Sequence, residues 1–203
     1  MKWTGDNSKE FEQPPVGTTV ARCIKVIDIG TQVGEYQGQP THKRQVIIGW
    51  ELPTELMGEG EHKGKPFVVS RFYTASLNEK ANLRKDLENW RGRPFTDVEL
   101  GGFDSKNVLG KTCMVSLMQN EKGKVRVSGV IAMPKGMEVP AQVNPSVYFS
   151  LDEFSEPVFE SLSDGYKKMI AASPEYAKIL APKPKKSIAD MPSDDIDTDD
   201  IPF

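Results

Sequence analysis

The chain has 203 residues, a hydrophobic content of 37% and a formal net charge of −3. This length fits one domain of about 130–180 residues with a tail, or two small domains. No run approaches the ~18 apolar residues of a membrane-spanning helix, and the N-terminal MKWTGDNSKE lacks the apolar core of a signal peptide. These features exclude a membrane protein and lead us to expect a soluble, intracellular one.

The cysteines and histidines predict no metal site. Cys23 and Cys113 lie far apart in sequence, which fits reduced thiols inside strands. His42 and His62 stand at no metal-ligand spacing from either cysteine. We therefore expect neither a structural zinc nor any other cofactor.

The net charge changes sign along the chain. Residues 1–140 carry a net charge of +3, residues 141–180 carry −3, and residues 181–203 carry −3. A mildly basic body can bind a polyanion, and an acidic tail can compete for the same groove. A net charge of +3 alone does not indicate nucleic acid.

Three segments rich in β-branched and aromatic residues predict an antiparallel meander. Residues 16–29 (VGTTVARCIKVIDI) are followed by the polar stretch TQVGEYQGQPTHK, which we expect to be a loop. Residues 44–52 (RQVIIGWEL) alternate, so that one face holds Val46, Ile48, Trp50 and Leu52. Residues 65–74 (KPFVVSRFYT) follow a glycine-rich loop. Short connections favour pairing of neighbouring strands.

A helix and two further strands follow. Ser76 and Glu79 have the spacing of a capping box, and Leu83, Leu87 and Trp90 form an amphipathic stripe that ends at Gly92. Residues 111–119 and 124–132 predict a hairpin around NEKG. Three strands, a helix and two strands is the order of the OB-fold, a five-stranded Greek-key barrel that binds oligonucleotides across strands two and three.

These patterns divide the chain into four parts. We expect a flexible N-terminus (1–15), an OB-fold (16–140), a helical extension (141–180) and a disordered linker with an acidic tail (181–203). The extension contains apolar residues at helical spacing, and Ser173-Pro174-Glu175 is typical of a helix start. Its helices can pack on the barrel or mediate self-association.

Binding of a single strand needs cations for phosphates and flat side chains for bases. Candidates on strands two and three, in the adjoining loops and on the last hairpin are Tyr36, Lys43, Arg44, Trp50, Lys63, Lys65, Phe67, Arg71, Phe72, Tyr73, Lys111, Lys122, Lys124 and Arg126.

Several of these candidates have a second interpretation. Tyr36 in a loop is a better stacking residue than Trp50, whose apolar face favours the core. On the third strand, either Phe67 with Tyr73 or Phe72 is buried. We favour the face of Phe67, Arg71 and Tyr73 for DNA, because a cation between two rings suits that role. The alternating cations near residue 125 are equally typical of a solvated strand face.

The last nine residues, DIDTDDIPF, are typical of a short peptide that binds a partner. An apolar pocket can take the tip and a basic rim the carboxylates. The residues that we expect to bind a partner are Asp195, Asp197, Asp199, Asp200, Ile201, Pro202 and Phe203.

This ending resembles the C-terminal tip of bacterial and phage single-stranded DNA-binding proteins. The segments YTASLNEKANLRKDLENWRGRPFTDVELGGF and LGKTCMVSLMQNEKGKVRVSGVIAMPKG resemble a phage family of single-stranded DNA-binding replication proteins. The resemblance implies coating of single strands in phage replication, recombination and repair, in the cytoplasm of an infected bacterium. It also implies that the tail recruits replication and repair proteins.

The sequence leaves two functions open and argues against catalysis. It has no phosphate-binding GxxxxGK[ST] loop, no catalytic triad pattern and no set of paired carboxylates. The first function is coating of single-stranded DNA by a monomer or homodimer. The alternative is an adaptor that does not bind DNA and whose tail imitates the host tip to divert host replication proteins.

Overall fold

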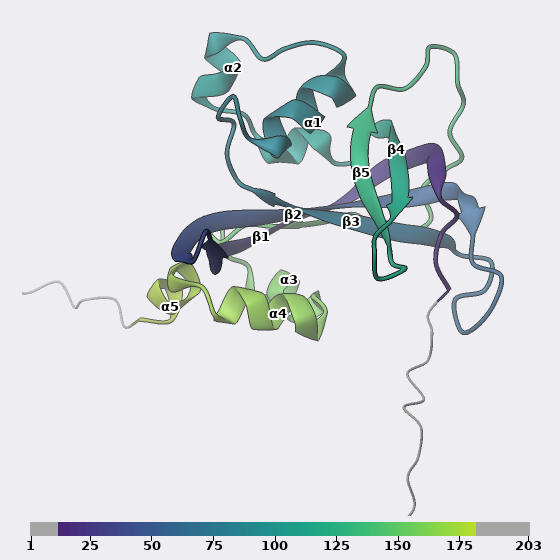
Figure 1. The fold of residues 1–203 in the computed structure, drawn as a ribbon. Helices are drawn as coiled ribbons and strands as arrows, with labels where there is room; N and C mark the ends of the chain where they lie inside the picture. The colour runs from purple at the N-terminus through teal and green to yellow at the C-terminus, as the bar shows by residue number, and fades with distance from the viewer. Residues whose placement is uncertain (1–11, 182–203) are drawn as a thin grey trace, which may run out of the picture.

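The computed structural model describes residues 12–181, which form a mainly β structure with short helices (Figure 1). The strands are β1 (Gly17–Tyr36), β2 (Gln39–Leu56), β3 (Pro66–Thr74), β4 (Thr112–Gln119), β5 (Val125–Ile131) and β6 (Val147–Phe149). The helices are α1 (Asn82–Arg91), α2 (Asp97–Gly101), the 3-10 helix η1 (Ser105–Val108), α3 (Glu156–Ser161), α4 (Asp164–Ala171) and α5 (Pro174–Leu180). The prediction of a mainly β chain with C-terminal helices is confirmed.

Strand β1 is the centre of the sheet. The strand order is β3-β2-β1-β4-β5, with antiparallel neighbours, and the short β6 pairs parallel to β1 at Lys25–Ile27. Figure 1 shows α1 and α2 on one side of β1–β2–β3 and α3–α5 on the other, while the β4–β5 hairpin crosses these strands. Both faces of the central strands are therefore covered over much of their length.

The first hairpin is longer than its sequence suggests. We expect a loop between residues 30 and 43, but β1 and β2 pair as far as Tyr36 and Gln39. The turn residues Gln37 and Gly38 both have positive φ, 52° and 76°. Two such residues form the tight turn whose twist matches paired strands, so the polar stretch forms a projecting arm.

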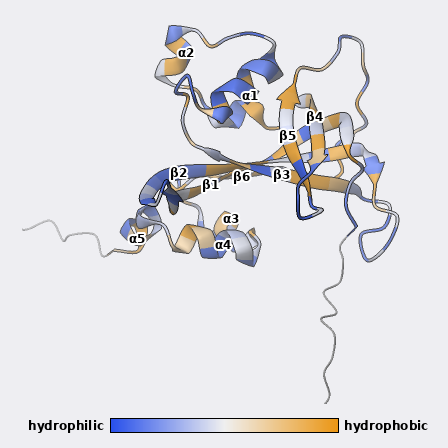
Figure 2. Cartoon of the chain, in the orientation of Figure 1, coloured by the Kyte–Doolittle hydropathy of each residue, from blue (hydrophilic) through white to orange (hydrophobic). Residues whose placement is uncertain are grey.

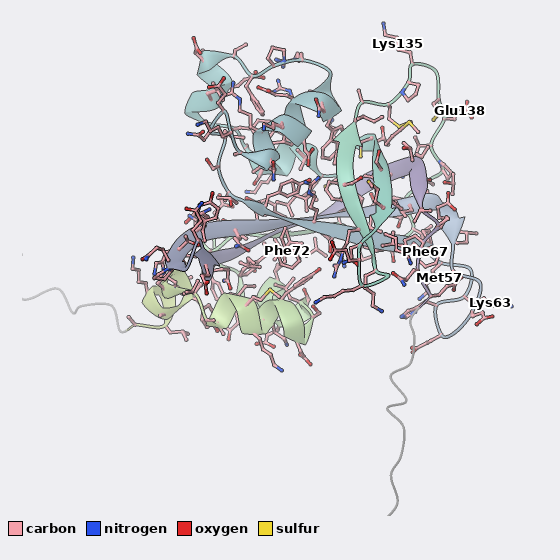
Figure 3. All side chains as sticks on the ribbon, in the orientation of Figure 1. Met57, Lys63, Phe67, Phe72, Lys135 and Glu138 are labelled. Atoms are coloured by element: carbon pink, nitrogen blue, oxygen red, sulfur yellow. The ribbon has the colours of Figure 1, made fainter. Side chains whose placement is uncertain are left out.

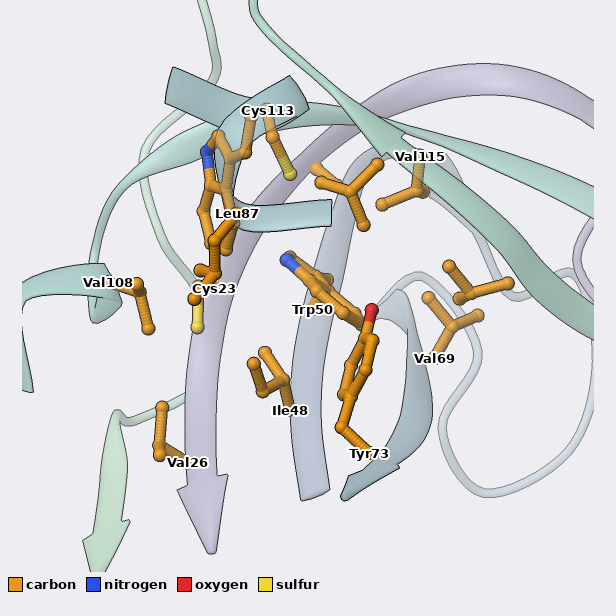
Figure 4. Close-up of a cluster of buried hydrophobic side chains, with 14 of the residues drawn as sticks. Cys23, Val26, Ile48, Trp50, Val69, Tyr73, Leu87, Val108, Cys113 and Val115 are labelled. Carbon is orange, nitrogen blue, oxygen red and sulfur yellow. The ribbon is translucent and has the colours of Figure 1, made fainter. Parts of the chain in front are cut away.

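The main core lies between the sheet and α1 (Figure 4). Trp50 is completely buried and its ring centroid lies 6.1 Å from that of Trp90 on α1. Both cysteines are buried here as free thiols. Burial raises the pKa of the Cys23 thiol to about 12. Figure 2 shows apolar residues along the strands and hydrophilic residues in the hairpin turns, as expected for a sheet covered on both faces.

A second core joins the opposite face of β1–β2 to the C-terminal helices. It contains Ile27, Ile29, Ile47, Phe149, Leu151, Phe159, Leu162 and Ile170. Polar contacts reinforce it, because Thr31 donates to Glu175 through its backbone nitrogen (2.8 Å) and its hydroxyl (2.6 Å). The segment 147–180 thus packs on the same chain.

The helix start predicted at Ser76 is wrong. Ser76 and Asn78 each accept a backbone hydrogen bond two residues ahead, and these turns delay the start of α1 to Asn82, with Ala81 as N-cap. The capping box instead lies on α2, where Thr96 and Glu99 bond reciprocally. The predicted end at Gly92 is confirmed, since this residue has φ 67°.

Among residues 12–181, no helix is long and apolar enough to cross a membrane. The acidic tail and most of its linker lie outside the described residues.

Candidate nucleic-acid interface

The structure corrects the face of β3 that we favoured for DNA. Phe67 and Tyr73 are buried in the main core, while Phe72 remains 44% exposed and Val68 41% exposed on the other face. Alternate residues of a strand point to opposite faces. The second face of β3 therefore consists of Val68, Ser70, Phe72 and Thr74, which pair with Glu51, Gly49, Ile47 and Gln45 of β2. The β2 part of this face is covered at Ile47 and Glu51, whereas Val68 and Phe72 stay exposed.

Arg71 closes the core instead of facing solvent. Its Nη1 donates to Asp86 on α1 and to the carbonyl of Ser128 on β5, both at 2.9 Å. The Tyr73 hydroxyl donates to the same Asp86 oxygen at 2.8 Å, and the guanidinium lies 5.2 Å from the Tyr73 ring centroid. Burial, followed by the nearby Asp86, raises the pKa of Tyr73 above its usual range. These contacts commit Arg71 to joining α1, β3 and β5.

Two further candidates have structural partners. Trp50 is completely buried, so it cannot stack on a base without unfolding. Arg44 pairs with Asp28 and with Asp152, the latter at 2.8 Å. Hydrogen bonding to Asp28 raises the pKa of Arg44 above its usual range. Arg44 anchors the turn after β6 to the sheet.

An open groove of about 620 Å³ lies where β2 begins and β3 ends. Phe72 lines it together with Lys43 and Lys80, and the remaining lining residues are Gln45, Tyr73, Thr74, Ser76, Asn78, Ala81 and Asn82. None of these residues is acidic. The groove thus offers one exposed ring, two ammonium groups, and amide and hydroxyl groups that can bond base edges. These are the components that single-strand recognition needs.

The carboxylate of Glu51, which β2 places on this face, is sealed from solvent. Glu51 is completely buried and accepts hydrogen bonds from the backbone nitrogens of Val143 and Asn144, at 3.0 and 2.6 Å, and from Asn144 Nδ2 at 2.7 Å. The segment before β6 therefore covers its charge.

The remaining candidates are exposed on loops and hairpins. Tyr36 is 63% exposed at the tip of the first arm. Lys63 and Lys65 lie on the β2–β3 loop, at the opposite end of β3 from Phe72 (Figure 3). Lys111, Lys122, Lys124 and Arg126 are exposed before β4 and around the β4–β5 turn. The structure therefore groups Lys43 with Phe72 but places the other cations elsewhere.

Lys25 and Lys80 belong to this face, and sequence reasoning missed both. Lys25 is the cross-strand partner of Gly49, which pairs with Ser70, so these three share a face with Phe72. A Cβ at Gly49 would lie 3.1 Å from the Lys25 Cβ, so glycine makes room for the lysine stem. Burial lowers the pKa of Lys25. Among residues 12–181 no carboxylate lies within salt-bridge distance of it. The sequence feature that could have identified Lys25 as a candidate is its position as the one lysine of the strand segment CIKVIDI (residues 23–29).

In the part of the chain that the structure describes, no cluster of three or more histidine, cysteine or acidic side chains could hold a metal ion. The tail residues 195–203 lie outside the described range. No family model, curated protein or solved structure matches this chain significantly.

Proposed function

We propose that this protein binds single-stranded DNA without sequence specificity, at the groove that the exposed face of β3 forms with the start of β2. The observation that carries the proposal is the groove in which the exposed Phe72 ring shares a wall with Lys43 and Lys80 and no carboxylate. A ring can stack on any base and ammonium groups can bind any phosphate, which makes such binding tolerant of sequence. Lys25 extends the cationic character of this face along β1.

We further propose that the sheet is an OB-fold barrel. The supporting observations are the position of α1 between β3 and β4, the sharing of β1 between β2 and β4, and the Arg71–Ser128 contact between β3 and β5. In an OB-fold, strands two and three and the adjoining loops bind oligonucleotides, and the groove lies where β2 begins and β3 ends.

The sequence resemblance supplies the biological setting of the proposal. The protein coats single strands in phage replication, recombination and repair, in the cytoplasm of the infected bacterium, as a monomer or homodimer. Its segment DDIPF binds replication and repair enzymes. The same acidic segment competes with DNA for the basic face, so removal of residues 195–203 strengthens binding, most at low salt where charges are least screened.

The first test is an anisotropy titration with a labelled 30-nucleotide oligo(dT), using the full chain, a 1–194 truncation and Phe72 variants. Loss of one base stack costs about 1–3 kcal/mol, so Phe72→Leu should weaken binding by about 5- to 150-fold. Phe72→Tyr, which keeps the ring, should bind like the original protein. Ile131→Ala is the matched control, because Ile131 on β5 has the same 44% exposure as Phe72 but does not line the groove.

Three outcomes would argue against the proposal. Equal binding by Phe72→Leu and the original protein would place the DNA elsewhere. Equal or weaker binding by the truncation would exclude competition by the tail. If no form binds oligo(dT), the adaptor function, in which the tail alone acts on host replication proteins, becomes the better explanation.

A further inference from the structure

The chain fills a small anion site with one of its own carboxylates. The backbone nitrogen of Gly58 donates to both oxygens of Glu12, at 3.0 and 2.9 Å, and the nitrogen of Glu59 donates to one of them at 3.1 Å. Glu12 lies just before β1, and the two amides lie in the β2–β3 loop. All three residues are on the surface.

The next residue ties the same segment to a second loop. Gln13 Nε2 donates to the carbonyl of Gly123 at 3.1 Å, and the nitrogen of Val125 donates to Gln13 Oε1 at 2.7 Å. Residues 12–13 therefore bridge the β2–β3 loop and the β4–β5 turn, and we call them the N-terminal strap. Figure 1 shows the start of the described chain beside both loops.

Successive backbone N–H groups that point at one acceptor form a concavity for anions. A phosphate oxygen accepts the same hydrogen bonds as a carboxylate oxygen. The loop holds this shape, because Gly64 donates to Met57 at 2.7 Å and Met57 donates to Lys65 at 2.9 Å. Lys63 and Lys65 are exposed on it. Because Glu59 and Glu61 balance these lysines, the amide pair, and not the net charge of the loop, makes it an anion site.

We propose that the amides of Gly58 and Glu59 are a phosphate subsite of the DNA-binding face and that Glu12 is its internal competitor. This inference rests on the proposed function. The loop precedes β3 and the Phe72 groove lies at the end of β3, so a single strand that occupies both runs along the nine residues of β3, about 30 Å. When the strand arrives, its phosphate replaces the Glu12 carboxylate and the strap leaves the loop.

Competition between Glu12 and a phosphate should lower the apparent affinity for the strand by a measurable factor. If Glu12 occupies the amides about 80% of the time, the subsite is free about one fifth of the time, and the apparent affinity for the strand falls about fivefold. Glu12→Gln keeps the length of the side chain but removes its charge. Glu61→Gln removes the same charge from the same loop, and Glu61 makes no side-chain hydrogen bond among the described residues, which makes it the matched control.

The test compares oligo(dT) binding by the full-length original protein, Glu12→Gln and Glu61→Gln at low salt. We expect a gain of about fivefold for Glu12→Gln and less than about twofold for Glu61→Gln. Equal gains would mean that only net charge matters and would overturn the inference. No gain for Glu12→Gln would also overturn it.

A second readout is independent of DNA binding. In ¹⁵N-resolved NMR spectra of Glu12→Gln, titration with inorganic phosphate should shift the Gly58 and Glu59 amide signals saturably, and at lower concentration than in the original protein. If oligo(dT) binds to none of the proteins but phosphate produces these shifts, the DNA function fails and the phosphate subsite stands. Absence of shifts at both amides would overturn the subsite.

Discussion

Arg71 on β3 and Asp86 on α1 form a partly buried ion pair, with Nη1 2.9 Å from the carboxylate oxygen. The same guanidinium reaches the Ser128 carbonyl of β5, and the same carboxylate oxygen accepts the Tyr73 hydroxyl. One residue of β3 thus connects the helix and the strand that cover this end of the main core.

Replacement of Arg71 should affect folding more than DNA contact. Arg71→Ala removes the guanidinium donor from the Ser128 carbonyl and from Asp86, which keeps the hydrogen bond from Tyr73. Loss of hydrogen bonds to charged groups costs about 1.5–3 kcal/mol. Urea unfolding should show this loss in the free energy of unfolding. Arg126→Ala, an exposed cation on β5, should stay within about 0.5 kcal/mol of the original protein. An unchanged stability for Arg71→Ala would mean that the ion pair does not hold β3 to α1.

The free energy of unfolding should depend on pH through the protonation of Asp86. Burial raises its pKa above the ordinary 3.8, although the hydrogen bond from Tyr73 and the charge of Arg71 oppose this shift. In the interval above 3.8 the native state therefore binds this proton more than the unfolded state does. The stability that Asp86 contributes then falls as the pH rises through this interval.

Urea unfolding of the original protein and of Asp86→Asn between pH 3 and 7 measures this contribution. The difference in free energy of unfolding, original minus variant, should decrease from about pH 4 upward and then level off. An increase over the same range would show that attraction by Arg71 outweighs burial.

Gly30 should tolerate no side chain. It has φ +71°, and a Cβ there would lie 2.5 Å from the Cβ and Oγ of Ser173 and 2.9 Å from Glu175 Oε2. Gly30→Ala combines left-handed strain of about 1–2 kcal/mol with overlap of about 1–3 kcal/mol, and we expect a loss near 3 kcal/mol in the free energy of unfolding. Proteolysis should then cut the α4–α5 region sooner.

Substitution of Gly38 separates the backbone strain of a positive φ from the overlap of an added Cβ with its neighbours. It has φ +76° but no atom within 4 Å of an added Cβ. Gly38→Ala should therefore lose only about 1–2 kcal/mol. Equal losses at both positions would mean that the C-terminal helices move away from β1 without cost.

The salt dependence of oligo(dT) binding should identify the phosphate contacts of the groove. Each lost contact lowers the slope of log K against log salt by about 0.7 for single strands. Lys43→Ala and Lys80→Ala should each produce this change, and the double variant about 1.4. Lys135→Ala removes the same charge from a distant loop (Figure 3) and should leave the slope unchanged.

The local pattern of the sequence determined the mainly β class, the shared face of Val46, Ile48, Trp50 and Leu52, and the end of α1 at Gly92. These features depend on alternation and on backbone preferences, which neighbouring residues settle. The extent of the first arm escaped prediction, because the positive φ of Gln37 at its tip is unusual for a residue with a side chain.

Only the tertiary structure decided which face of β3 is buried. The strand carries aromatic residues on both faces, so its own pattern is ambiguous. Leu87 and Trp90 of α1, which lie later in the chain, pack into the core that buries Phe67 and Tyr73, and this leaves Phe72 outside. The same is true of Lys25 beside Gly49 and of Glu12 on the β2–β3 loop. Their partners are remote in sequence, and contacts between remote residues exist only once the whole chain has packed.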